Sequence, residues 1–261
     1  MVSVASIVFS HKLTSTTNEL VVNAGAVYTE FMTKYGQYCP TARAAEILGD
    51  RWTLLIIRDL LCGVNHFNEL ERGLPGISRA LLAERLRRLQ QVGIVERKDV
   101  RDRQRTSYQL TRAGIELRET VNSLTQWGAK WAFGEPEPAE LDPVLLLWWM
   151  RDRVYSERLP KKQMVVEFVF RPVHKRKYWL VLKPDDVSVC LQYPGFESDV
   201  LVNADLSAFY QVWLGRTTFA DALRNRSIEI VGIPSLVRGF PRWFALSPVA
   251  ELVRKAEKFQ K

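Results

Sequence analysis

The chain has 261 residues, of which 47% are hydrophobic and 25% are charged, so it is long and apolar enough for one large or two ordinary packed domains. Its formal net charge of +8 indicates an anionic partner such as nucleic acid or a membrane surface. Three widely spaced cysteines exclude a disulfide framework and a zinc-finger spacing, and no stretch approaches the ~20 apolar residues of a membrane span, so we expect a cytoplasmic protein.

Residues 1–30 are predicted to be a weakly structured tail. They lack the basic start of a signal peptide and are interrupted by polar residues. The recognisable pattern begins just after Met32, which is therefore an alternative start of the protein.

Residues 31–133 are predicted to form a domain of helices and one hairpin. Apolar residues at helical spacing predict helices over residues 41–49, 51–61, 67–72 and 78–92, with Asp50 and Ser78 as N-caps. Two strand-like runs, 94–97 and 106–110, flank a charged tip, and Thr111 is expected to begin a long helix that reaches Trp131. This order of elements is typical of a winged helix-turn-helix.

Residues 134–140 are rich in proline and glutamate and are predicted to be a stiff linker to a second domain, residues 141–261. That domain opens with an apolar helix over 143–155. Runs rich in Val, Phe and Tyr predict strands over 164–171, 178–183, 187–193, 199–202 and 227–231, and helices are expected over 205–214 and 218–225. The fold class is therefore α+β, a winged helix-turn-helix followed by a sheet covered by helices on one side.

The helix over residues 78–92 separates an apolar face from a polar one, and its leucines fall within one arc. The segment from Arg79 to Arg105 holds nine Lys or Arg against four acidic residues, which suits contact with DNA phosphates. Arg79 is the candidate for a base contact, Arg87 for a base or a phosphate, and Arg88 for a phosphate. A solvated charged surface is the alternative. The predicted DNA-binding residues are Ser78, Arg79, Ala83, Glu84, Arg87 and Arg88 on the helix and Arg101, Arg103 and Arg105 on the wing.

Other polar side chains are predicted to be structural. Arg85 points toward the leucines and is expected to pair with Asp59, and Cys62 and Cys190 lie in apolar runs and are expected to be buried. The sequence contains no Gly-rich phosphate loop, no HExxH, no GxSxG and no paired zinc ligands, and its three histidines are far apart. We therefore expect no catalysis, no metal and no cofactor.

Residues 38–132 resemble the HxlR-type winged helix-turn-helix regulators. The resemblance is carried by YCPTARAAEILGDRWTLLIIRDLLCG, by HFNELERGLPGISRALLAERLRRLQQVGIVER and by YQLTRAGIELRETVNSLTQWG, in the family's order and spacing. It implies a homodimer, assembled by the first helix region and the long helix after the wing, that binds double-stranded DNA at two half-sites. Cys39 stands directly before Pro40, where some family members have a thiol switch; a structural cysteine near the dimer contact is the alternative.

Residues 141–250 resemble, more loosely, a sterol-carrier-protein domain. The resemblance is carried by VVEFVF, by YWLVL and the following VSVCLQYPGFESDVLVNADLSAFYQVWLGRTTFADAL, and by IEIVGIPSLVRGFPRWF. It implies an apolar tunnel that accepts lipid-like molecules, and an ordinary core or an empty dimerisation module is the alternative. The candidate lining residues are Trp148, Phe168, Phe170, Trp179, Phe209, Trp213, Phe240 and Trp243.

Together these features predict a dimeric transcriptional regulator, a repressor, whose operator binding is changed by an apolar ligand in the second domain or by oxidation of Cys39. The rival hypothesis is a lipid-binding carrier whose winged helix is only an interaction module. The basic wing favours the regulator, because a protein-binding module has no need of Arg101, Arg103 and Arg105.

Overall fold

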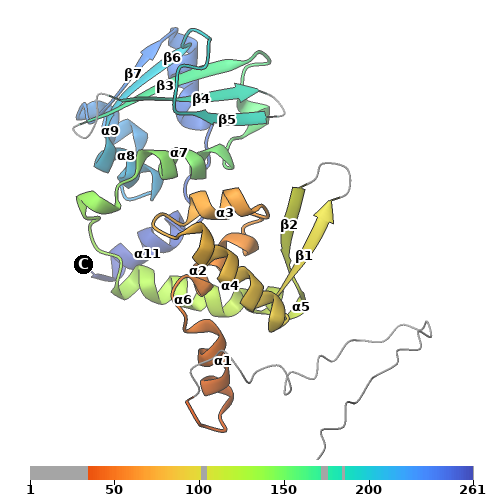
Figure 1. Cartoon of the computed structure of the whole chain (residues 1–261). Helices are drawn as coiled ribbons and strands as arrows, with labels where there is room; N and C mark the ends of the chain where they lie inside the picture. Colours follow the sequence, from red (N-terminus) through yellow and green to blue (C-terminus); the bar gives the residue numbers. More distant parts are fainter. Residues whose placement is uncertain (1–34, 101–104, 172–175, 184–185, 261) are drawn as a thin grey trace, which may run out of the picture.

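The computed structural model describes residues 35–100, 105–171, 176–183 and 186–260 (Figure 1). The predicted tail, residues 1–30, and the wing-tip residues Arg101 and Arg103 lie outside the described residues.

The N-terminal half is a winged helix-turn-helix. Its elements are α1 (Pro40–Leu48), α2 (Thr53–Leu61), α3 (Phe67–Gly73), α4 (Arg79–Gln91), β1 (Val95–Val100), β2 (Arg105–Leu110), α5 (Arg112–Glu116) and α6 (Arg118–Trp131). Strands β1 and β2 pair antiparallel to form the wing. Ile56, Ile57, Leu70 and Leu82 are fully buried and belong to the core that joins α2, α3 and α4. Burying these side chains together fixes α4 against α3.

Two predictions at helix ends are corrected by the structure. Asp50 does not cap α2: the helix begins two residues later than predicted, at Thr53, after Trp52, whose φ of 81° places it in the left-handed region. The predicted long helix after the wing is two helices, α5 and α6, divided at Leu117. Its cap is confirmed, because the Thr111 hydroxyl accepts a hydrogen bond from the Gly114 N–H at 3.3 Å.

The C-terminal half is a mixed sheet with helices. Its elements are η1 (Pro138–Glu140), α7 (Pro143–Arg151), η2 (Ser156–Arg158), β3 (Met164–Arg171), β4 (Lys177–Lys183), β5 (Asp186–Cys190), β6 (Val200–Asp205), α8 (Leu206–Trp213), α9 (Phe219–Arg224), β7 (Ile228–Gly232), α10 (Pro234–Gly239), η3 (Phe240–Arg242) and α11 (Ala250–Gln260). The strand order is β5-β4-β3-β6-β7, with β3 and β6 parallel and the other neighbours antiparallel. Helices α7 and α8 pack on one face of this sheet and close its main core.

Three contacts join the described residues of the two halves. Helix α7 packs on α3, and α11 returns to pack along α6 (Figure 1). At the first contact the Trp148 ring lies between two guanidinium groups, with Cζ of Arg72 4.8 Å and Cζ of Arg151 3.6 Å from its centroid. At the third, Arg216 donates to the linker carbonyls of Phe133 and Gly134 at 3.0 and 2.9 Å. The C-terminal half is therefore attached directly to the helix-turn-helix.

Candidate nucleic-acid interface

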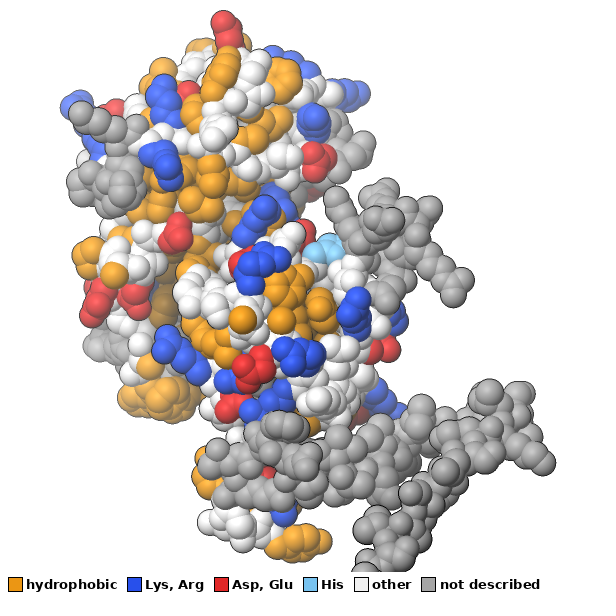
Figure 2. All heavy atoms as spheres, in the orientation of Figure 1, with side chains coloured by type: hydrophobic (Ala, Val, Ile, Leu, Met, Phe, Trp, Pro, Cys, Tyr) orange, Lys and Arg blue, Asp and Glu red, His pale blue; other side chains and the backbone are white. Residues whose placement is uncertain are grey.

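Helix α4 presents the polar face of the helix-turn-helix. The Ser78 hydroxyl accepts a hydrogen bond from the Leu81 N–H at 3.2 Å, so the predicted N-cap is confirmed. Leu82, Leu86 and Leu89 are buried against α2 and α3, because they recur on one side of the helix. The opposite side exposes Ser78, Arg79, Ala80, Glu84, Arg87 and Gln91, with Ala83 partly buried beside them. This side carries both signs of charge, as Figure 2 shows over α4.

Arg79 begins this face and is held by α3. Its Nη1 pairs with Oε2 of Glu71, its Nη2 donates to Oδ1 of Asn68 at 3.2 Å, and its Cζ lies 4.9 Å from the centroid of the Phe67 ring. The side chain is nevertheless 62% exposed. Arg79 therefore keeps donors free for a ligand while its guanidinium is oriented by three neighbours.

Arg87 and Arg88 are adjacent but have different environments. Arg87 is exposed, and no hydrogen bond or ion pair joins it to another described residue. Arg88 is 20% exposed, pairs with Oδ2 of Asp50 and donates to the carbonyl oxygen of Glu46 at 3.4 Å. The predicted phosphate contact therefore fits Arg87, whereas Arg88 ties α4 to the residues before α2.

The predicted pair between Arg85 and Asp59 is wrong. Arg85 lies 3.8 Å from Asp50 and 2.9 Å from Glu84, because α4 crosses the turn before α2 rather than the middle of that helix. Asp59 pairs with its neighbour Arg58 at 2.7 Å. Burial raises the pKa of Asp59, and the Arg58 charge opposes that shift.

The wing carries further basic side chains on its described strands. Arg97 and Lys98 of β1 are exposed, and Lys98 pairs with Glu96 at 2.8 Å. These two residues were not among the predicted contacts, although they lie in the basic segment that the sequence marks. Arg105 begins β2, and its side chain lies outside the described part of the chain. On α3, Asn68 and Arg72 are also exposed, and charge counting after residue 79 gives no signal for them.

Cys39 is the residue before α1 and is partly exposed. The backbone N–H of Ala42, and then that of Thr41, lowers the pKa of the Cys39 thiol. Arg43, the basic residue nearest to Cys39 in the sequence, pairs with Glu46 at 2.9 Å. Cys62, which was predicted to be buried, is exposed after the last turn of α2, and desolvation nevertheless raises its pKa.

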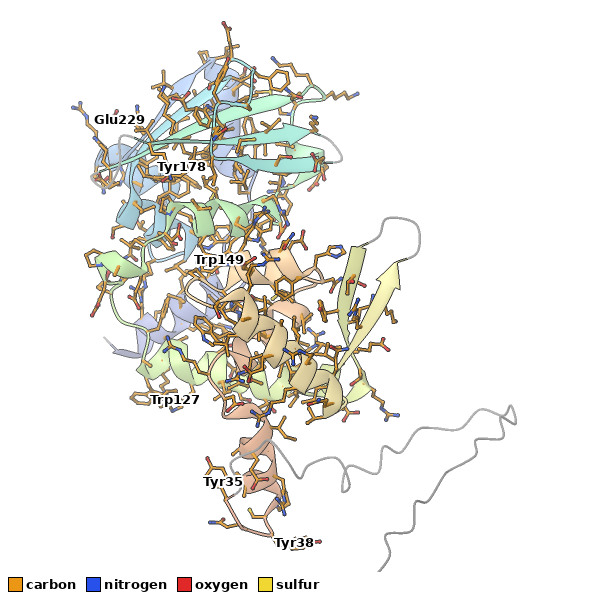
Figure 3. The ribbon with its side chains drawn as sticks, in the orientation of Figure 1. Tyr35, Tyr38, Trp127, Trp149, Tyr178 and Glu229 are labelled. Carbon is orange, nitrogen blue, oxygen red and sulfur yellow. The ribbon has the colours of Figure 1, made fainter. Side chains whose placement is uncertain are left out.

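Exposed apolar side chains lie at two places, on α6 and in the segment before α1. Leu124, Trp127 and Trp131 follow one another at helical spacing on α6 and are 48%, 61% and 60% exposed. Tyr35 and Tyr38 are also exposed, near the far end of α1 (Figure 3). Helix α6 has no buried residue, although α2 and α11 pack against it. An apolar surface of this kind is typical of a protein–protein contact.

The aromatic residues predicted to line a tunnel do not surround one space. Six of them are buried in the main core of the C-terminal half: Phe168, Phe170, Phe209, Trp213, Phe240 and Trp243. Phenylalanine rings among them pack against one another, for example edge to face at 5.9 Å between Phe168 and Phe209. Trp179 lies on the opposite face of the sheet with Val165 and Val181, because alternate residues of β4 point to opposite faces. Trp148 faces α3, as described above.

Two cavities among the described residues are lined largely by polar side chains. One, of about 600 Å³, is lined by Glu135, Gln211, Arg216, Asn225 and Glu257 among others, and the other, of about 570 Å³, by Glu69, Arg151, Asp152 and Lys183 among others. Neither includes any of the eight predicted lining residues. The described residues also contain no group of His, Cys, Asp and Glu that could hold a metal ion, and no described helix is long and apolar enough to cross a membrane.

Comparison with known proteins gives matches to the N-terminal half. The model of the HxlR-like helix-turn-helix family matches residues 47–135. Rv3095 of Mycobacterium tuberculosis, described as an uncharacterized HTH-type transcriptional regulator, is 46% identical over 87 residues, which are 33% of this chain and 54% of Rv3095. The chain thus spans about half the length of that relative.

Two regulators of Bacillus subtilis are covered almost completely. The uncharacterized HTH-type transcriptional regulator YvaP is 34% identical over 108 residues, which are 41% of this chain and 96% of YvaP. The solved structure of the reduced form of the transcriptional regulator YodB is 35% identical and covers 37% of this chain and 96% of YodB, with a TM-score of 0.33. The family model ends at residue 135, before the C-terminal sheet. Through its winged helix-turn-helix, this chain belongs to the HxlR-like helix-turn-helix family.

Proposed function

We propose that this protein is a transcriptional repressor that binds a two-fold DNA operator as a dimer. The observation that carries the proposal is the polar face of α4, which exposes Arg79 and Arg87 beside a basic hairpin while its leucines are buried. A helix with this division enters the major groove and places arginines against guanine edges and phosphates. The wing would then contact the neighbouring backbone through Arg97 and Lys98, and through the predicted residues Arg101, Arg103 and Arg105.

A second copy of the chain is the proposed occupant of the apolar surface on α6 and α1. Dimers that read DNA this way place two recognition helices about 34 Å apart, one for each half-site. The exposed Leu124, Trp127 and Trp131 would supply the buried centre of the contact, since tryptophans are enriched at such centres. The relative orientation of the two copies of α4 then depends on this contact.

Cys39 is the proposed switch. It lies directly before α1, close in sequence to the exposed Tyr38. Its lowered pKa increases the thiolate fraction at neutral pH, and the thiolate is the form that reacts with oxidants and electrophiles. Modification there would alter the contact between the two copies and, with it, the spacing of the recognition helices. A purely structural Cys39 is the alternative that the experiment below separates.

We assign no catalytic step or cofactor to the C-terminal half. Its sterol-carrier resemblance still suggests an apolar ligand, but such a ligand would have to displace packed aromatic rings, since Phe168, Phe209 and Phe240 are each at most 1% exposed. The carrier hypothesis is therefore not favoured as the main function. The thiol switch requires no such opening.

The proposal is tested by binding to DNA from the gene's own upstream region and to random DNA over a range of salt concentrations. We expect selective binding that is lost in the double variant Arg79→Ala/Arg87→Ala, and weakened when Cys39 is oxidised but not when the Cys39→Ser variant is treated in the same way. Equal, weak binding to both DNAs, lost in moderate salt, would show that charge alone is responsible. Equal sensitivity of wild type and Cys39→Ser to oxidant would make Cys39 structural.

A further inference from the structure

Helix α3 offers Arg79 a platform of three different side chains. Glu71 binds one terminal nitrogen of the guanidinium, Asn68 binds the other at 3.2 Å, and the Phe67 ring lies under the group at 4.9 Å from Cζ. The three contacts come from α3, whereas Arg79 is the first residue of α4. A solvated arginine has no need of such an arrangement, since a single exposed ion pair stabilises a protein little.

The platform itself is anchored in the core. Leu70, between Asn68 and Glu71 in the sequence, is fully buried, and Phe67 packs against the same apolar cluster. Glu71 is only 29% exposed, so its carboxylate is not free to follow the arginine outward. The position of the Arg79 guanidinium is thus fixed relative to the buried centre of the domain.

The arrangement leaves enough donors for a base. A guanidinium has five N–H groups, and the contacts to Glu71 and Asn68 use two of them. Reading a guanine needs two N–H donors in one plane, directed at O6 and N7. Because the plane of the group is set by Phe67 and by the two acceptors, the remaining donors have a defined direction.

We propose that Glu71 is a positioning residue that sets base specificity: with Asn68 and Phe67, it holds Arg79 in the orientation that reads one guanine in each half-site. This inference rests on the proposed DNA-binding function. Glu71 does not touch the base, and its carboxylate weakens attraction to phosphates, so its contribution is selectivity rather than overall affinity.

The test uses the full chain, a duplex selected by the wild-type protein from a random-sequence library, and every single-base-pair variant of that duplex. Arg79→Ala should abolish the preference at one position of each half-site. Glu71→Gln should reduce the preference at that same position about tenfold, while affinity for random DNA stays the same or rises. In the Arg79→Ala background Glu71→Gln should change the base preference no further, a result that a general effect on folding would not give.

Two further variants complete the design. Asn68→Ala removes a neutral acceptor and should reduce the preference at the same position by a smaller factor. Glu197→Gln, which removes the same charge from an exposed loop of the C-terminal half, should keep the wild-type profile. Three results for Glu71→Gln would overturn this inference but not the proposed function. They are a base-preference profile like that of the wild type, a loss spread evenly over all positions, and a gain in selective affinity. A wild-type protein that selects no sequence would overturn the proposed function, and the inference with it.

Discussion

Replacing Arg87 and Arg88 one at a time tests whether Arg87 contacts DNA while Arg88 stabilises the fold. The two residues are adjacent and identical in chemistry, so each is the control for the other. Arg88 pairs with Asp50 and donates to a carbonyl of α1, and the side chains of the pair are 20% and 32% exposed. A hydrogen bond to a charged group contributes about 1.5–3 kcal/mol when buried, and this exposure reduces it to roughly 1–2 kcal/mol. Arg88→Ala should lower the free energy of unfolding by that amount, whereas Arg87→Ala should leave it within about 0.5 kcal/mol.

For DNA binding, Arg87→Ala should have the larger effect and Arg88→Ala the smaller one. Each phosphate contact contributes about 0.9 to the slope of log K against log salt concentration, so a dimer that loses Arg87 from both subunits should lose about 1.8 from that slope. Arg88→Ala should leave the slope unchanged. Urea denaturation gives the first quantity, and fluorescence anisotropy of labelled operator between about 50 and 200 mM salt gives the second. If Arg88→Ala lowers the slope as much as Arg87→Ala and leaves stability unchanged, the assignment of Arg88 to the fold is wrong.

Three more outcomes follow from packing and from pKa shifts. Gly114→Ala would place a methyl group 2.4 Å from the carbonyl oxygen of Ile94, at the root of the wing, and should lower the free energy of unfolding by about 1–3 kcal/mol in urea denaturation. Gly128→Ala would place its methyl group more than 4 Å from every atom outside the neighbouring backbone of α6, and should raise that free energy by up to about 1 kcal/mol. Equal effects of the two substitutions would contradict the packing argument. Trp127→Ala removes a 61% exposed indole and should shift the protein toward monomer in sedimentation velocity, and an unchanged dimer would place the contact elsewhere. The pKa of Cys39 is lowered and that of Cys62 is raised. The rate of alkylation by iodoacetamide, followed by mass spectrometry, should therefore reach its plateau at a lower pH for Cys39 than for Cys62. The reverse order would remove the chemical basis of the switch.

The local features of the fold could be predicted from the sequence because they depend on neighbouring residues. Ser78 and Thr111 cap helices through contacts to an N–H three residues ahead, a geometry that a serine or threonine at a helix start produces by itself. Leu82, Leu86 and Leu89 of α4 repeat at helical spacing and are buried, as the period requires. The alternation along β4 could also have separated Trp179 from the other aromatic residues, since it differs by one position from Tyr178 and Leu180.

The ionic contacts could not be predicted in the same way, because they depend on how helices cross. Asp50 was assigned to a cap, and Arg85 was assigned to Asp59, on the basis of positions along single helices. In the structure Asp50 lies where α4 crosses the turn before α2, and there it meets both Arg85 and Arg88. Asp50, Arg85 and Arg88 each have a partner of opposite charge, but ion pairs between different elements have no fixed separation along the sequence. The environment of Asp59 could not be predicted either. Its Oδ2 is buried without a hydrogen-bond partner among the described residues, and no sequence pattern indicates such an atom.

The contacts between the two halves restrict how the C-terminal half can act on DNA binding. It touches α3 through α7 and touches α6 through α11, so it contacts the helix that orients Arg79 and the helix that carries the exposed tryptophans. Arg216 adds a third attachment: only 8% exposed, it binds Glu135 of the linker at 3.1 Å and Glu257 of α11 at 3.0 Å. A movement of the C-terminal half must therefore either carry α3 and α6 with it or break these contacts. If the proposed function is correct, the first would change base reading and dimer geometry together, since the proposal assigns them to α3 and α6, which the C-terminal half touches.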